Sequence, residues 1–322
     1  MRTGLLNLVI VVAGLAAVPA FAQSYPAKPV RLVVPYPPGG PVDNIGRILA
    51  QPLAPLLGQN VVVENRSGAG GSLGAEVVAR AAPDGYTMLL GNTGPMTVNP
   101  VLQPRLSYDP RKDFHPVTWL VSAQMVLVVH PSLPVRSVKE LVALARAHPA
   151  GLNYGSAGMG NLTHLGMELF QSMAKVKMTH VPYKGVAPAY VDLVSGELGL
   201  MFGNISGPLE YIRAGRMRVI AVSSSRRSPI LPQVPTVAES YPGFDLVTWM
   251  GIFVPAATTE AIRARLHGDI VKVLERPDVR DRLVGLGNEV VAGHAQQLAA
   301  HVHRELELYA KIIRTAGIKA EQ

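Results

Sequence analysis

The sequence predicts an α/β protein of two domains, each built on a mostly parallel sheet. Short apolar runs rich in β-branched residues, such as Val61–Val63, alternate along the chain with segments of helical apolar spacing. That alternation is typical of parallel strands covered by helices on both faces. Two longer extended runs, residues 117–130 and 244–254, flank one self-contained series of this kind. We interpret them as two crossings between the domains.

The N-terminus has the three parts of a secretory signal peptide. Met1-Arg2 gives a basic start, residues 5–18 form an apolar core, and Ala20-Phe21-Ala22 supplies small residues two apart. We expect cleavage after Ala22, with residues 1–22 removed and a periplasmic product. A retained membrane anchor is the alternative, and the absence of cysteine near the cut excludes a lipoprotein anchor.

The mature chain is large enough for two cores. Removing 22 residues from 322 leaves 300, with no second long apolar segment and no cysteine. An exported protein without disulfides depends on large self-sufficient cores. We expect domain 1 to take residues 23–122, domain 2 to take 123–228, and 229–322 to return to domain 1 with C-terminal helices.

The charge balance favours small anionic solutes as partners. Removing Arg2 from the 30 basic residues leaves 29 against 22 acidic residues, a net charge of +7. Nucleic acid, an anionic membrane surface or small acids could each suit this charge. The basic residues are scattered and aromatic residues make up 6%, so no stripe for nucleic acid is present.

The first motif is a strand, a Gly-rich turn and a helix. Residues 30–34 predict a buried strand, which Pro35, Pro37 and Pro38 terminate. Gly39-Gly40 lets the backbone turn closely, and Pro41 suits the first helical position, followed by apolar residues at helical spacing. Unpaired amides at such a helix start attract anions, although an ordinary βα connection is the alternative.

The same pattern repeats through the rest of domain 1. The sequence predicts strands at 61–65 and 86–90, a helix at 73–82, and Gly-rich loops at 67–72 and 91–94. The last loop contains Asn92 and Thr93. In parallel sheets ligands bind beyond the carboxyl ends of the strands, where all three loops of this domain fall.

Domain 2 is predicted as a second alternating series. Ser137 and Glu140 are spaced as a capping box at the start of a helix. Strands are expected at 152–154, 179–181, 199–202 and 218–223, with helices at 162–174, 187–195 and after Pro208. From about Thr259 the chain is predicted to be helical, with one short strand near 289–291.

The second motif, residues 153–164, repeats the logic of the first. A strand end leads into Ser156-Ala157-Gly158, whose backbone amides can meet an anion, and Asn161 precedes the next helix. Ser156 is not in a nucleophile elbow, because Tyr154 replaces the first glycine of that motif. His164 lies eight residues on, a poor place for a base acting on Ser156. We interpret His164 as positioning the loop or packing.

The other candidate motifs give weaker evidence for a function. Residues 68–74 lack the spacing of a dinucleotide fingerprint, and the remaining histidines show no metal-ligand clustering, so we expect no cofactor and no metal. Lys184 follows a domain 2 strand and either attracts an acidic ligand or is a solvated surface lysine. For Asn204, beyond the strand ending at Phe202, the same two alternatives remain.

Several ordered segments together resemble one family. They are YPAKPVRLVVPYPPGG from Tyr25 with Asp43, VVVENRSGAGG from Val61, PDGYT from Pro83, YGSAG from Tyr154 with His164, HVPYKG from His180, and LPQVPTVAE from Leu231. These resemble the Bug family, the solute-binding receptors of tripartite tricarboxylate transporters. The resemblance covers essentially the whole mature chain.

The resemblance implies a two-domain periplasmic-binding-protein fold, type II-like, that closes as a hinged clamp on a ligand in the cleft between its domains. It implies that a small carboxylate is held between two turns, Tyr36–Gly40 with Asp43, and Ser156–Gly158 with Asn161 and His164. It also implies membrane transporter subunits as partners of a receptor that we expect to be monomeric and not an enzyme.

This chain departs from the family pattern at two positions. Gly199 and Asn204 stand where relatives often have aspartate. Less negative charge near the cleft favours a plain mono- or dicarboxylate, including aromatic ones, over an amino acid. Two other functions remain open: a ligand-sensing receptor for a signalling partner, and an exported hydrolase using Ser156.

Overall fold

The computed structural model describes residues 25–103 and 105–318. The predicted signal peptide lies outside these residues. Among the helices of the described ranges, none combines the length and the apolar character needed to cross a membrane.

The described strands form one sheet in the order β2-β1-β3-β9-β4-β7-β5-β6, with β8 and β10 each paired to β4. The strands are β1 (Val30–Val34), β2 (Val61–Asn65), β3 (Thr87–Asn92), β4 (Phe114–Val129), β5 (Asn153–Ser156), β6 (Thr179–Pro182), β7 (Leu200–Asn204), β8 (Arg218–Val222), β9 (Val247–Pro255) and β10 (Glu289–His294).

Helices cover both faces of this sheet. The α-helices are α1 (Pro41–Leu57), α2 (Ser72–Ala79), α3 (Asn99–Leu102), α4 (Val138–Ala147), α5 (Leu162–Ala174), α6 (Val186–Ser195), α7 (Leu209–Arg213), α8 (Glu260–Glu275), α9 (Pro277–Gly285) and α10 (Ala295–Ala316). Short helical turns are η1 (Ala69–Gly71), η2 (Gly94–Val98) and η3 (Val237–Glu239).

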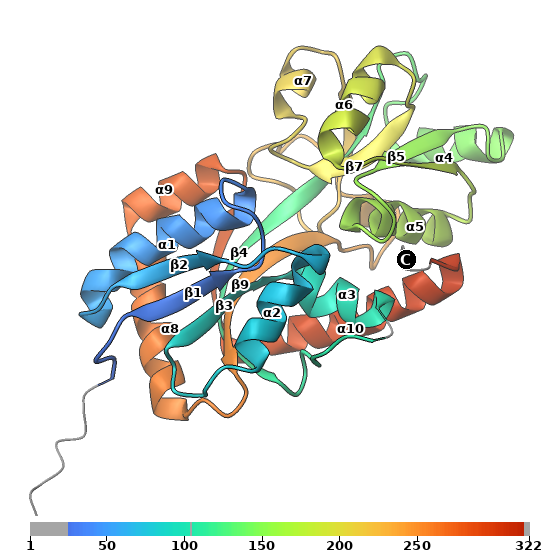
Figure 1. Ribbon diagram of the computed structural model, residues 1–322. Coiled ribbons are helices and arrows are strands. Elements are labelled where there is room, and N and C mark those ends of the chain that lie inside the picture. Colours follow the sequence, from blue (N-terminus) through green and yellow to red (C-terminus); the bar gives the residue numbers. More distant parts are fainter. Residues whose placement is uncertain (1–24, 104, 319–322) are drawn as a thin grey trace, which may run out of the picture.

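Strand β4 belongs to two groups of elements that Figure 1 shows as two lobes. Its first part, from Phe114 to Gln124, pairs with β9, and its last part, from Met125 to Val129, pairs with β7. We call the elements around β1, β2, β3, β9 and β10 the first lobe, and those around β5, β6, β7 and β8 the second lobe. One strand therefore connects the two lobes without a break.

Side-chain alternation along β1 builds the two layers of the first lobe. Val30, Leu32 and Val34 pack into one apolar cluster with α1, α8 and α9, whereas Val33 packs on the opposite face with α2 and the start of α10. In Figure 1 the strands lie between α1 and α2. The period of two along a strand thus fills both faces, as expected for a buried parallel sheet.

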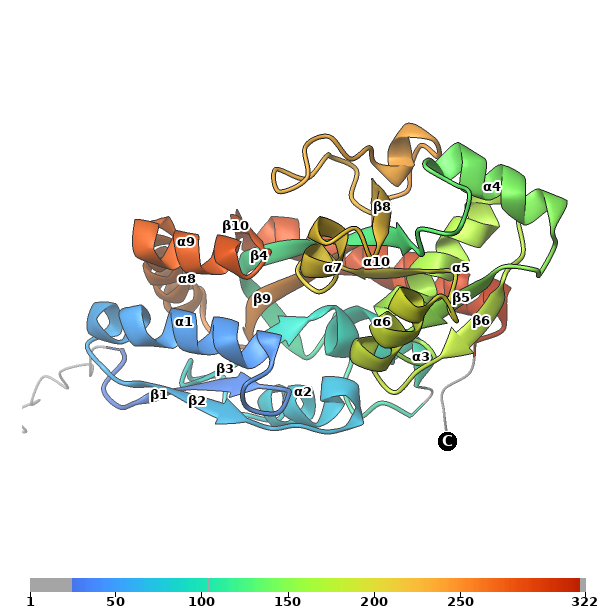
Figure 2. The ribbon, with the colours of Figure 1, turned by 90° about the horizontal axis from the view of Figure 1, so that it is seen from above.

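The second lobe is layered in the same way. Met125, Leu127 and Val129 of β4 pack with α4 and α5, while Val126 and Val128 face the cluster that contains α6. Figures 1 and 2 show α10 running from the first lobe to α5. The end of α10 joins the α5 cluster through residues such as Tyr309, so this helix contributes to the cores of both lobes.

The structure confirms the main helices and strands predicted from the sequence, and some of them begin or end at other residues than predicted. Both long extended runs are strands, β4 and β9, and Ser137 caps α4 by accepting a hydrogen bond from the Glu140 amide. The sequence assigned no helix to residues 94–102, where the structure has η2 and α3. Pro95, Pro100 and the short length of each turn conceal the helical periodicity there.

Candidate functional site

The Gly-rich turns of the two lobes converge on the middle of β4. At the carboxyl end of β3, Asn92 pairs with Met250, which in turn pairs with Val121 of β4. At the carboxyl end of β7, Asn204 pairs with Met125 of β4. Strands β1 and β2 run parallel to β3, and β5 and β6 run parallel to β7, so the carboxyl ends of both sets approach residues 121–125.

The first turn is organised by Asp43. Its buried carboxylate accepts hydrogen bonds from the Gly39 amide (2.9 Å), from Arg47 Nε (2.8 Å) and from Asn65 Nδ2 (2.9 Å). The hydrogen bond from Arg47 lowers the pKa of Asp43 to about 2, against the opposing effect of burial. Gly39 has φ +80°, which favours glycine. Asp43 therefore holds the turn, and its oxygens are already used by protein donors.

Tyr36 joins the first turn to the loop after β3. Its hydroxyl lies 3.3 Å from Asn92 Oδ1 and donates to the Gly70 carbonyl at 3.3 Å. A Cβ on Gly94 would lie 2.7 Å from this hydroxyl, so glycine is required for the approach. Burial raises the pKa of Tyr36. Thr93, next to Asn92, is buried and accepts a hydrogen bond from the Trp249 amide (3.4 Å).

The second turn satisfies several of its own amides. The Ala157 amide donates to Thr163 Oγ1 (2.9 Å), the Gly158 amide to Ser156 Oγ (3.2 Å), and the Gly160 amide to His164 Nδ1 (3.0 Å). Asn161 caps α5 by accepting from the Thr163 amide. The sequence interpretation treated this turn as a set of available amides, whereas these amides have partners inside the turn.

A histidine stack lies beneath the second turn. The rings of His164 and His180 are parallel, with centroids 3.9 Å apart, and the Tyr154 ring stacks on His180 at 4.9 Å. Ser156 Oγ and His180 Nε2 share a hydrogen bond of 2.7 Å. Tyr154 donates a hydrogen bond to Glu168 at the far side of the stack. The two imidazoles thus support Ser156 and the Gly160 amide from below.

Both stacked histidines are held neutral. Burial lowers the pKa of His164 and of His180 to about 4, and in His180 the neighbouring His164 lowers it further. The sequence interpretation missed His180, which lies 24 residues from Ser156. Parallel pairing of Tyr154 with His180 is the signal that could have found it. A Ser–His hydrogen bond is the geometry of an activated nucleophile, but Ser156 is 0% exposed.

The remaining candidates lie at the edges of the second lobe. Lys184 is exposed after β6, and Asn204 is exposed at the carboxyl end of β7. Gly199 precedes β7, where its amide donates to Asn153 Oδ1 (2.8 Å). Gly199 is therefore at the opposite end of the strand from the turns. Of the two positions, only Asn204 reduces the negative charge near the turns.

The two lobes touch beside the second turn. Gly160 lies against Leu102 of α3, so closely that a Cβ on Gly160 would come within 2.4 Å of the leucine side chain. A similar approach brings Gly287, after α9, to Ser206 of the second lobe. The second turn is thus packed against a first-lobe helix that follows the Asn92 loop.

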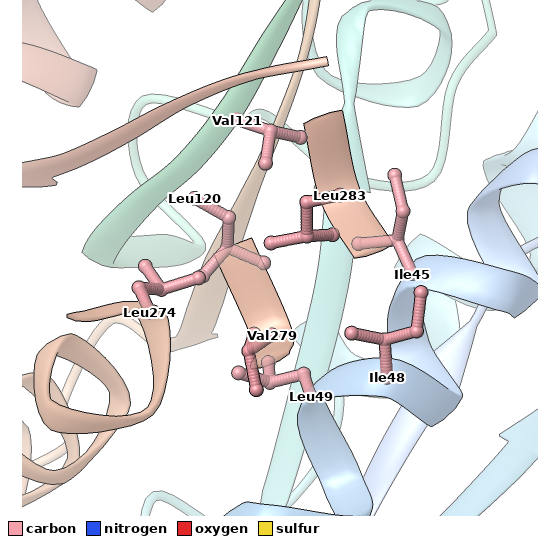
Figure 3. Close-up of a pocket in the computed structure, with 8 residues that line it drawn as sticks. All are labelled: Ile45, Ile48, Leu49, Leu120, Val121, Leu274, Val279 and Leu283. Carbon is pink, nitrogen blue, oxygen red and sulfur yellow. The ribbon is translucent and has the colours of Figure 1, made fainter. Parts of the chain in front are cut away.

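Figure 3 shows an apolar gap elsewhere in the first lobe. Eight aliphatic side chains line it, and it has no room for a water-sized sphere. They are Ile45, Ile48, Leu49, Leu120, Val121, Leu274, Val279 and Leu283. With no polar group in its wall, this gap is part of the core and not a binding site. Among the described residues, no three His, Cys, Asp or Glu side chains are placed to hold a metal ion.

Known proteins resemble this chain along most of its length. The profile of the tripartite tricarboxylate transporter family receptor matches residues 45–318. Protein BugT of Bordetella pertussis is 36% identical over 98% of this chain and 97% of its own.

Two solved structures are also similar. Rpa4515 of R. palustris, with adipate, has a TM-score of 0.77 and 36% identity over 92% of this chain and 99% of its own. MatC of Rhodopseudomonas palustris, with bound malate, has a TM-score of 0.73 and 34% identity over 90% and 100%.

Proposed function

This chain belongs to the tripartite tricarboxylate transporter family receptors, and from that premise we propose that it captures a small carboxylate in the periplasm and delivers it to a membrane transporter. The family is one of solute-binding receptors and not an enzyme class. The observation that carries the proposal is the convergence of Gly-rich turns from both lobes on residues 121–125 of β4.

The ligand carboxylate is assigned to the space between the two turns. Residues 36–40 precede α1, whose first turn has no side-chain cap, so the positive end of this helix can act on an anion. Residues 156–158 approach from the other lobe. Gly39 and Gly40 are exposed or half-exposed residues, as are Ala157 and Gly158, although the amides of Gly39, Ala157 and Gly158 donate within the turns.

Three of the candidate residues act as positioning residues in this proposal. Asp43, Asn161 and His164 use their polar atoms to hold the turns. Tyr36 and Asn92 form a wall on the first-lobe side, next to the buried Thr93, which is bonded to the Trp249 amide. Lys184 and Asn204 lie at the second-lobe rim. Ser156 orients the second turn through its hydrogen bonds to His180 and the Gly158 amide.

The ligand class is a mono- or dicarboxylate without an amino group. Two relatives were solved with adipate and with malate, both aliphatic dicarboxylates. Asn204 places a neutral amide at the rim, so an ammonium group on the ligand gains no ion pair from it. We expect a carboxylic acid to bind more tightly than the amino acid of the same skeleton, and a measured preference for the amino acid contradicts this assignment.

A thermal-shift screen of the chain without residues 1–22 tests the function. Adipate, malate and aromatic carboxylates are compared with amines, sugars and phosphates. A ligand at 100 times its Kd stabilises the protein by about 2.7 kcal/mol, which moves the midpoint visibly. Stabilisation by carboxylates alone supports the proposal, and stabilisation by sugars or amines alone overturns it.

A glycine substitution links binding to the second turn. Gly158 has φ +123°, so Gly158→Ala strains the turn, and we expect at least about tenfold weaker carboxylate binding by calorimetry. Gly243→Ala is the matched control, because Gly243 also has a positive φ (+90°) but lies in an exposed loop. Equal binding by both variants contradicts the role of this turn.

Each of the two alternative functions, a hydrolase and a sensory receptor, has its own test. The Ser156–His180 hydrogen bond favours hydrolysis, and release of nitrophenol from nitrophenyl esters, lost in Ser156→Ala, supports that function. A sensory receptor predicts that the liganded chain binds a signalling protein and not reconstituted transporter subunits.

A further inference from the structure

A pocket of about 240 Å³ lies in the first lobe, at the far end of the sheet from the turns. His115, at the start of β4, pairs with Val254, whereas the turns approach β4 at residues 121–125. Six residues of strand separate His115 from Val121, about 20 Å at roughly 3.3 Å per residue. A pocket of this size exceeds the ~10–15 Å³ that one water needs, so it can admit a small solute.

Three imidazoles and one guanidinium gather in the wall of this pocket. His115 comes from β4, Arg263 and His267 from α8, and His294 from the junction of β10 and α10. The rings of His267 and His294 lie 4.9 Å apart between centroids. Three elements, β4, α8 and the end of β10, therefore contribute nitrogen-bearing side chains to one place. The lining residues also include one carboxylate, that of Glu260, an exposed residue in the first turn of α8.

Arg263 is the group whose hydrogen bonding is incomplete. Its Nε is buried and has no hydrogen-bond partner among the described residues. A buried donor of a charged group without a partner costs free energy that a ligand acceptor can recover. The other arginine of α8, Arg265, is instead paired with Asp269. The unpaired donor therefore distinguishes Arg263, whose side chain lines the pocket, from its neighbour.

His115 and His267 each use their Nδ1 in a hydrogen bond within the protein. His115 Nδ1 donates to the Pro116 carbonyl (2.6 Å), and His267 Nδ1 is bonded to Thr118 Oγ1 (2.9 Å). Because the neutral His115 ring carries its proton on Nδ1, its Nε2 is an acceptor and does not donate to an anion, and His267 also meets the Val117 backbone. Burial lowers the pKa of both histidines, and Arg263 adds to this effect at His115. Arg263 is then the permanent positive charge of the pocket at neutral pH.

We propose that this pocket is a second ligand site, separate from the two turns, that binds a small oxyanion through the Arg263 guanidinium, with His267 and His294 beside it. A carboxylate or a phosphate presents the acceptor that the Arg263 Nε lacks. The start of α10 at Ala295, in the same wall, adds the positive end of a helix dipole. A divalent metal is not the expected occupant, because no three metal-ligating side chains of the described residues are suitably placed.

Histidine-resolved NMR tests this site directly. The chain without residues 1–22, labelled with ¹³C-histidine, is titrated with sodium acetate and with inorganic phosphate at constant ionic strength and pH. We expect saturable shifts of the ring signals of His115, His267 and His294 with at least one anion. The two titrations distinguish a carboxylate from a phosphate as the preferred oxyanion. Shifts that stay linear with concentration, or that fall on His164 and His180 instead, overturn the proposal.

Matched arginine variants test whether Arg263 binds the anion. Arg263→Met should weaken the saturating anion's affinity at least tenfold, whereas Arg280→Met, at an exposed arginine of α9, should leave it unchanged. Arg263→Lys retains the charge without the Nε donor, and we expect partial weakening of three- to tenfold. Equal affinity in Arg263→Met and wild type rules the site out. Because Gly158→Ala affects only the turns, retained anion binding in that variant separates this site from the proposed carboxylate site.

Discussion

At the scale of single residues, the candidate site depends on side chains that hold backbone in place. Asp43 fixes the first turn through Gly39 and Asn65, and His164 and His180 fix the second through Gly160 and Ser156. These groups are buried or half-buried, and each is hydrogen-bonded within the protein. A receptor that binds through its backbone needs such supports, since the turns alone are free to rearrange.

Substitution of Asp43 tests the first support. In Asp43→Asn the ion pair with Arg47 is lost, and the amide NH₂ replaces one acceptor oxygen, so it faces either the Asn65 donor or the donors of Gly39 and Arg47. We expect a loss of about 1–3 kcal/mol in the free energy of unfolding, measured by urea denaturation, together with weaker carboxylate binding. Asp278→Asn, at an exposed pair with Arg276, is the control and should change stability little. Equal loss in both variants contradicts the assigned role.

The stacked histidines give the protein a defined response to acid. Their pKa is about 4 in the folded state against 6.5 for an ordinary histidine. Between pH 6.5 and about 4 the unfolded chain therefore binds protons that the folded chain does not, so stability falls as the pH falls through this range. Below about pH 4 this contribution is already lost.

Melting temperatures between pH 7 and 4 check this response. His164→Gln and His180→Gln should each reduce the dependence of the melting temperature on pH. His303→Gln, at an exposed histidine of α10, should retain the wild-type dependence. If all three variants follow the wild-type curve, the buried pair does not set the response.

Sequence reasoning found the turns and the supports close to them in the chain, but not the supports on neighbouring strands. Asn161 and His164 are close in the chain to the residues they hold, so local patterns reach them. The partner of Ser156 is His180, on the neighbouring strand, and only the parallel register of β5 and β6 brings the two together. The same holds for Asn65, which meets Asp43 through the pairing of β1 with β2.

At the scale of elements, β4 and α10 connect the lobes. The sequence predicted an extended run at residues 117–130, which are mostly apolar and rich in β-branched valine. It did not predict that α10 reaches the second lobe, because an amphipathic helix does not reveal which surface its apolar face covers. In the structure, Leu298 packs in the first lobe and Ile312 in the second.

A buried carboxylate fastens α10 to the elements beside the site. Glu305 Oε2 accepts from Trp249 Nε1 (2.7 Å) of β9 and from Thr97 Oγ1 (2.9 Å) of η2, while Oε1 accepts from the Tyr309 hydroxyl (3.1 Å). The segment η2 directly follows Asn92 and Thr93 of the candidate site. The position of α10 is therefore linked to the loop after β3.

Substitution of Glu305 tests this fastening. Glu305→Gln places an NH₂ group against donors, and we expect a loss of about 1–3 kcal/mol in the free energy of unfolding. Glu307→Gln, two residues on and exposed, is the matched control. Unfolding in urea, followed by tryptophan fluorescence, compares the two. A Glu305 variant as stable as the Glu307 variant shows that these hydrogen bonds contribute little.

At the scale of the whole molecule, the fold brings two sets of strand ends to one place. Alternating strands and helices were sufficient to predict α/β architecture and the carboxyl-end position of every Gly-rich turn. The strand order, with β9 and β4 between β3 and β7, comes from long-range pairing that local pattern does not encode. The contacts of Gly160 with Leu102 and of Gly287 with Ser206 show the lobes in contact around that place.

The central claim is that a small carboxylate binds between the two turns. A crystal structure of the chain without residues 1–22, grown with the best carboxylate from the thermal-shift screen, tests it most directly. We expect one ligand carboxylate in contact with residues 36–40 of the first lobe and with residues 156–161 of the second. A carboxylate that contacts neither turn, or that occupies only the pocket around Arg263 and His115, would contradict this account of the receptor.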